Sequence, residues 1–183
     1  RLTGNYERLL GITWSEFWDG TKTGIQVREE LLTKINSILE SILDIKISDL
    51  GNINEGKGQL YFEKEESKDF PYENLSSGEK EVVDIVLDLV VKTPIFDDTV
   101  FCIDEPELHL NTAIQRKLLI EINKLIPANS QLWLATHSIG FLRALQEDLK
   151  DKSQILDFSE NSYFEGTQCI KPIKTSRGNW QRI

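Results

Sequence analysis

The chain has 183 residues, of which 39% are hydrophobic and 28% are charged, as is typical of a single soluble globular domain. Thirty acidic residues against 21 basic ones give a net charge of −9 at pH 7. This balance counts against a general nucleic-acid-binding surface, which needs clustered Lys and Arg. No apolar run approaches the roughly 20 residues of a membrane span. With two cysteines and no signal-peptide pattern, we expect a cytoplasmic protein with no membrane partner, in which Cys102 packs as a small hydrophobic side chain.

Residues 1–70 are expected to form a helix and a β-hairpin. Apolar residues recur at three- and four-residue steps from Gly24 to Ile45, which predicts an amphipathic helix. Two short runs of β-formers, Ile45–Leu50 and Gln59–Glu63, flank a segment rich in Gly and Asn and predict the hairpin. The charged stretch Lys64–Tyr72 is typical of a loop.

Residues 71–158 are expected to form an α/β core with a parallel sheet, because predicted strands and helices alternate there. The helix Glu79–Lys92 is apolar on most sides and is therefore expected to be buried. The strands Thr99–Ile103 and Gln131–Ala135 are apolar runs typical of buried parallel strands. The other predicted elements are helices over Thr112–Ile126 and from Ser138 to about Lys150, and strands Ile155–Phe158 and Cys169–Ile173. Residues 159–183 then hold the terminal strand and the start of a following element.

Asp104 and Glu105 are the first candidate functional residues, because they follow a predicted strand at the end where α/β sheets bind ligands. Side chains alternate along a strand, so one carboxylate can hold a magnesium ion while the other reaches an attacking water. The alternative is an acidic turn that only ends the strand.

Leu75–Glu79 opens the long helix, and Ser76 with Glu79 fits a capping box. This can be a plain helix start. The same geometry also suits an anion at the helix N-terminus, with Gly78 leaving the backbone open to a phosphate. His137 follows the second strand at the same sheet edge, where it is either a structural residue or a hydrogen-bonding group of the site.

In this order the motifs resemble those of the ATP-binding-cassette class of P-loop ATPases. Leu75–Glu79 resembles the signature motif, Phe101–Glu105 the Walker B motif, Pro106–Leu110 the D-loop and His137 the switch histidine. The soluble branch is the most similar: RecF-like and SMC-like DNA-repair ATPases, the overcoming-lysogenisation-defect family, and ATPase subunits of anti-phage systems. The resemblance is strongest from Pro71 to about Phe158.

The resemblance implies the C-terminal part of a parallel-sheet P-loop NTPase fold, with ATP and Mg²⁺ as cofactors. It implies that Asp104 coordinates magnesium, that Glu105 polarises the attacking water as general base, and that His137 contacts the γ-phosphate.

The resemblance also implies a homodimer or higher oligomer formed through the ATP sites. The residues that would face the ATP bound by a second subunit are Ser76, Ser77, Gly78 and Glu79. Glu107 and His109 of the D-loop would lie at the same dimer interface. Asn111 departs from the histidine or proline expected after the D-loop.

A phosphate-binding loop, the first half of such a site, is not recognisable in the chain. The segment Gly51–Lys57 fits G-x-x-x-x-G-K, but Gly58 stands where Ser or Thr would ligate magnesium, and a predicted strand follows instead of a helix. We interpret it as the hairpin turn. The Walker A loop is therefore expected upstream of Arg1. The chain starts with Arg1 and contains no methionine, so it is expected to be a fragment of a longer protein.

The leading hypothesis is an ATPase whose ATP-dependent dimerisation controls DNA-directed work in repair or anti-phage defence. DNA or a nuclease partner would then contact regions outside this chain. The alternatives are the nucleotide-binding subunit of a membrane transporter and a non-catalytic interaction module that kept the fold.

The chain by itself is predicted not to hydrolyse ATP, because the lysine and backbone N–H groups of a phosphate-binding loop supply much of the catalysis. Phosphate release by the purified chain, with and without Glu105→Gln, measures this. Turnover that Glu105→Gln abolishes would contradict the prediction.

Overall fold

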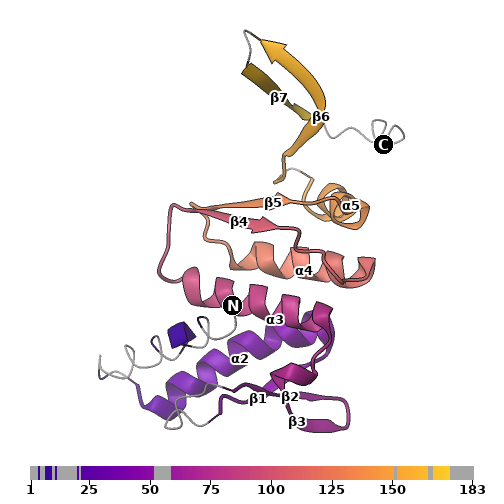
Figure 1. The fold of residues 1–183 in the computed structure, drawn as a ribbon. Coiled ribbons are helices and arrows are strands. Elements are labelled where there is room, and N and C mark those ends of the chain that lie inside the picture. Colours follow the sequence, from indigo (N-terminus) through magenta and orange to yellow (C-terminus); the bar gives the residue numbers. More distant parts are fainter. Residues whose placement is uncertain are drawn as a thin grey trace. The chain divides into compact units, whose positions relative to one another are not determined.

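A computed structural model describes residues 4, 7–9, 11, 20, 22–51, 59–150, 152–164 and 167–173. The chain divides into two compact units, Arg1–Ser138 and Ile139–Ile183. The first unit holds α2–α4 and β1–β5, and the second holds α5, β6 and β7 (Figure 1).

The hairpin prediction is confirmed by the antiparallel pairing of β1 (Lys46–Asp49) with β2 (Tyr61–Lys64), in which Ile47 lies opposite Phe62. Residues 52–58, which include most of the literal phosphate-loop match, lie outside the described residues.

A third strand corrects the prediction of a loop over Lys64–Tyr72. β3 (Ser67–Pro71) pairs antiparallel with β2 and completes a sheet of order β1-β2-β3. The turn between them contains Glu65 at a φ of 52°. Such turns usually carry Asn or Gly at positive φ, so this hairpin has no turn signal in its sequence.

The three long helices of the first unit agree closely with their predicted ranges: α2 (Gly24–Leu43), α3 (Ser77–Lys92) and α4 (Thr112–Leu125). A short 3₁₀ turn, Tyr72–Asn74, leads into α3. α2 packs against α3, α4 and β1. Nine residues of α3 are buried, which confirms the prediction of a buried helix.

The parallel sheet is confirmed by β4 (Val100–Asp104) and β5 (Gln131–Ala135), which pair parallel along their whole length (Figure 1). The prediction that both strands are buried is wrong. Phe101 is 7% exposed, whereas Val100 is 49% and Trp133 56% exposed. Because side chains alternate along a strand, Cys102 lies on the same face as Val100 and is exposed too, contrary to expectation. Within the described part of the first unit, only one face of this sheet is covered.

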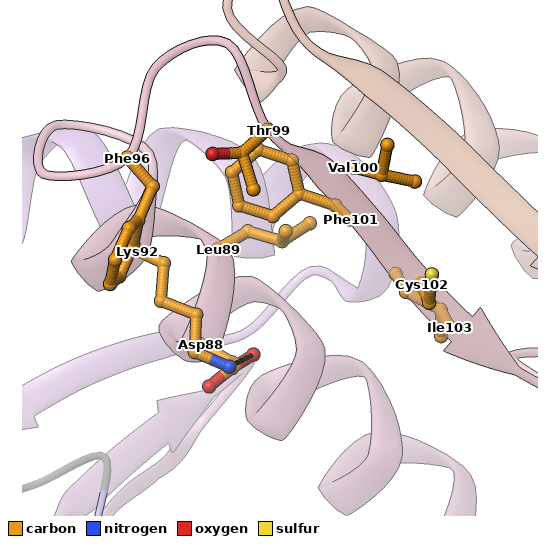
Figure 2. Close-up of a pocket in the computed structure, with 9 residues that line it drawn as sticks. All are labelled: Asp88, Leu89, Lys92, Phe96, Thr99, Val100, Phe101, Cys102 and Ile103. Carbon is orange, nitrogen blue, oxygen red and sulfur yellow. Dashed lines mark hydrogen bonds and ion pairs between the residues drawn. The ribbon is translucent and has the colours of Figure 1, made fainter.

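A cavity of about 250 Å³ lies between the C-terminal half of α3 and the side of β4. Figure 2 shows Asp88 and Lys92 of α3 on one side of it, joined by an ion pair of 2.6 Å, and Phe101 of β4 on the other. None of the candidate site residues lines this cavity, so it is separate from the site described below.

The second unit contains α5 (Ile139–Asp148), β6 (Ile155–Phe164) and β7 (Thr167–Ile173). β6 and β7 pair antiparallel, as expected for two strands joined by a turn, and β6 is longer than predicted. Of the helices that the structure describes, none has the length and apolar character needed to cross a membrane.

An ion pair ties the three-stranded sheet to the start of α3. Lys64 Nζ of β2 lies 2.7 Å from Glu79 Oε1, and Glu79 Oε2 accepts hydrogen bonds from the backbone N–H and the hydroxyl of Ser76. Burial alone would raise the pKa of Glu79, but the hydrogen bonds from Lys64 and Ser76 outweigh it and lower this pKa below its ordinary value. The hydrogen bond to Glu79 raises the pKa of Lys64.

Lys64→Met is predicted to lower the free energy of unfolding at neutral pH by about 0.5–1 kcal/mol, the range for a pair that solvent screens in part. Glu79 has the lower pKa in the folded state, so its contribution is present above the ordinary carboxyl value of about 4.3 and is lost as the pH falls through the folded value. Urea unfolding between pH 3 and pH 7 measures the effect.

Lys68→Met, at an exposed position of β3, is the control and should leave the stability unchanged. The ion pair would not have this role if Lys64→Met lowered the free energy of unfolding by the same amount at pH 3 and at pH 7.

Candidate functional site

The C-terminal ends of β4 and β5 lie level with each other, because Asp104 pairs with Ala135. The backbone N–H of Glu105 donates to the carbonyl oxygen of Ala135 over 2.8 Å. Glu105 then adopts a φ of 47°, a left-handed conformation that is uncommon for a residue with a Cβ. The chain therefore turns sharply away from the sheet directly after the two carboxylates.

The two predicted catalytic residues come together at this edge. His137 Nε2 lies 3.7 Å from Glu105 Oε1. The His137 side chain is 91% exposed and that of Glu105 is 42% exposed, so both remain accessible to a ligand. A carboxylate beside an imidazole at the end of a parallel sheet can orient a water molecule and contact a charged substrate group.

Asp104, the predicted magnesium ligand, is exposed at the last position of β4. Magnesium is commonly held by one or two carboxylates together with water and substrate phosphates. The carboxylate oxygens of Asp104 and Glu105 suit that requirement. Among the described residues, no three His, Cys, Asp or Glu side chains form a metal-binding cluster.

Glu107 of the D-loop turns its carboxylate toward its own chain. Its Oε1 accepts a hydrogen bond of 2.6 Å from the Thr136 hydroxyl and one of 2.9 Å from the backbone N–H of His137. His109, the other predicted interface residue, is exposed and has a φ of 62°.

Gln115 of α4 is a site residue that the sequence analysis missed. It is only 6% exposed, and its side-chain amide donates to the carbonyl oxygen of Leu110 while accepting from the Ser138 hydroxyl, at 2.9 and 2.6 Å. The available signal was a polar residue on the buried face of an amphipathic helix. Asn111, the unexpected residue after the D-loop, caps α4 by accepting from the backbone N–H of Ile114.

The start of α3 has the predicted capping box, in which Ser76 and Glu79 bond reciprocally. Ser77 is exposed at the first position of the helix. The hydrogen bonds of Ser76 stay within this helix start and reach neither Glu105 nor His137 in the part of the chain that the structure describes. The predicted signature residues and the predicted catalytic residues thus share no Ser76 hydrogen bond in the described part of the chain.

Gly78 connects the helix start to the D-loop by close backbone packing. A Cβ on Gly78 would lie 2.6 Å from the carbonyl oxygen of His109 and 3.0 Å from Leu110 Cδ2. Gly78 is also buried. The glycine is therefore required by a contact within the chain.

Gly78→Ala is predicted to destabilise the protein by about 1–3 kcal/mol, the usual cost of overpacking. The direction of this change in stability is informative, because alanine in an unhindered helix is favoured over glycine by about 1 kcal/mol. Thermal unfolding measures the change, with Ser77→Ala at the exposed neighbouring position as control. A Gly78→Ala protein as stable as its parent would contradict the contact with His109.

The family model described as "AAA domain, putative AbiEii toxin, Type IV TA system" matches residues 18–143. No curated protein matches the sequence of the chain.

Among solved structures, the chain is similar to one titled "Structural biochemistry of ATP-driven dimerization and DNA stimulated activation of SMC ATPases", with a TM-score of 0.60, 14% identity, and coverage of 82% of this chain and 87% of that one. It is also similar to the Smc head domain with an extended coiled coil, bound to the C-terminal domain of ScpA, from Pyrococcus furiosus (TM-score 0.58, 14% identity, coverage 82% and 36%). A third is the Smc head domain with a coiled coil and joint from Pyrococcus yayanosii (TM-score 0.58, 14% identity, coverage 82% and 28%). The chain thus spans about a third of the length of the last two.

The family match covers more than half of the chain, and the fold is that of the SMC head. The chain belongs to this AAA family, and it shares the fold of SMC ATPases.

Proposed function

We propose that the chain supplies the signature, Walker B, D-loop and switch-histidine parts of an ATPase that dimerises when it binds ATP. The observation that carries this proposal is the 3.7 Å contact between His137 Nε2 and Glu105 Oε1 at the end of β4 and β5. Glu105 and His137 are 32 residues apart in the sequence. The contact brings them together at the sheet edge where α/β proteins bind ligands.

Each residue at the edge has one role in hydrolysis. Glu105 accepts a proton from the attacking water, and His137 contacts the γ-phosphate through its exposed imidazole. Asp104 would hold a magnesium ion, which would neutralise charge on the phosphate oxygens.

The signature residues act on the ATP of a second subunit. Ser76 and Ser77 are exposed at the N-terminus of α3, where backbone N–H groups and the helix dipole favour an anion. Gly78 and Glu79 contribute indirectly, through the groups that they contact. Gly78 allows close packing on His109, and Glu79 holds the Ser76 hydroxyl.

The dimer controls DNA-directed work in repair or defence, carried out by DNA-binding or nuclease parts outside this chain. Support comes from a structure of similar fold, whose title reports ATP-driven dimerisation and DNA-stimulated activation of SMC ATPases. The net charge of −9 favours DNA contacts elsewhere in the assembly, since a phosphate backbone is bound by clustered Lys and Arg.

In the complete natural protein, Glu105→Gln is predicted to lower kcat by about 100-fold or more, as expected for loss of a general base. Glutamine keeps the size of the side chain, so ATP and Mg²⁺ should still bind and the ATP-bound dimer should accumulate. Phosphate release and light scattering after size exclusion, with and without ATP, measure the two effects.

Glu66→Gln is the matched control, because Glu66 is exposed in the turn between β2 and β3, away from the site. A Glu105→Gln protein that remains monomeric with ATP would count against the action of Ser76–Gly78 on a second subunit. Undiminished hydrolysis by that variant would overturn the role of Glu105.

A further inference from the structure

The carboxylate of Glu107 links the D-loop to the loop that carries His137. One oxygen, Oε1, accepts both the Thr136 hydroxyl at 2.6 Å and the backbone N–H of His137 at 2.9 Å. The other oxygen, Oε2, is buried and has no hydrogen-bond partner among the described residues.

The bond to His137 reaches the backbone and not the imidazole. The His137 side chain is 91% exposed, and its one ion-pair contact in the described residues is the 3.7 Å approach to Glu105. The position of the imidazole therefore depends on where the backbone of His137 is held. That backbone is held by Glu107.

A second link runs in parallel with the first. Gln115 joins the carbonyl oxygen of Leu110, at the end of the D-loop, to the hydroxyl of Ser138. The Thr136 hydroxyl, which donates to Glu107, also accepts the backbone N–H of Ser138 at 3.0 Å. The D-loop and the His137 loop are thus joined at both ends, so a displacement of one displaces the other.

The D-loop also rests on the signature helix, because the backbone of His109 lies against Gly78. The contacts form one continuous path from α3 through the D-loop to His137. Leu108 and His109 of the D-loop are exposed. A partner subunit that contacted them would therefore act on this path.

We propose that Glu107 is a positioning residue, through which the placement of the D-loop sets the distance between His137 and Glu105 in the same chain. This rests on the proposed function, and it gives dimerisation a route to the hydrolytic residues of each subunit. A side chain that served only as a dimer contact would point outward, whereas the Glu107 carboxylate points inward to Thr136 and His137.

Three variants of the complete natural protein separate this role from others. Glu107→Ala removes both hydrogen bonds and is expected to lower kcat about 10- to 100-fold, the size of effect that a displacement of about 1 Å has on a catalytic group. KM for ATP should change by less than about threefold, because His137 is only one of the groups that contact ATP. Glu107→Gln keeps an oxygen where Oε1 accepts both bonds, so it should restore most of kcat. Glu66→Ala is the control and should behave as the parent protein.

A double-mutant cycle with His137→Ala tests whether Glu107 acts through the histidine. Glu107→Ala should have little further effect on kcat once the imidazole is absent. Hydrogen exchange of the 136–138 segment without nucleotide supplies a readout other than activity, and protection there should fall in Glu107→Ala and be largely kept in Glu107→Gln.

Several results would overturn the proposal. They are a Glu107→Ala enzyme with unchanged kcat and unchanged exchange at 136–138, fully additive effects with His137→Ala, or a Glu107→Gln enzyme as impaired as Glu107→Ala. A Glu107→Ala protein whose ATP-dependent dimerisation fails while its exchange is unchanged would show a dimer contact instead. A parent protein without ATP hydrolysis would overturn the proposed function itself, which distinguishes that failure from a failure at Glu107.

Discussion

Five consecutive residue pairs, from Val100 with Gln131 to Asp104 with Ala135, hold β4 and β5 parallel and in register. The rest of the candidate site depends on this pairing, because it places the residues that follow both strands at one edge. A slip of one residue would move one strand end by about 3.3 Å and turn its side chains to the opposite face. Either change would separate Glu105 from His137.

The loops beyond the strands are braced by internal hydrogen bonds, while the side chains of the candidate catalytic residues remain accessible. Glu107 and Gln115 join the D-loop to the His137 loop, and Gly78 seats the D-loop on α3, a helix with nine buried residues. The Glu105 side chain is half-exposed, and the His137 side chain is almost fully exposed. This division suits an enzyme site, in which the supporting residues are rigid and the reacting groups meet a ligand.

The differences between the predicted and the observed strands have a common physical origin. β3 was predicted as a loop because its charged residues do not alternate with apolar ones, and its backbone hydrogen bonds to β2 leave no trace in composition. β4 and β5 were predicted as buried on both faces from apolar runs alone. Apolar residues show that a strand suits burial, whereas the elements packed on each face decide whether Val100, Cys102 and Trp133 are covered.

The amino-acid sequence by itself determined the helices, both parallel strands, the capping box at Ser76 and the order of the motifs. Each of these depends on neighbours within a few residues, so periodicity and local chemistry suffice. Only the tertiary structure decided that Glu107 points inward, that Gln115 joins two loops, and that Gly78 lies against His109. These contacts join residues 23 to 31 positions apart. They form only after strand register and loop direction are established, which no local pattern encodes.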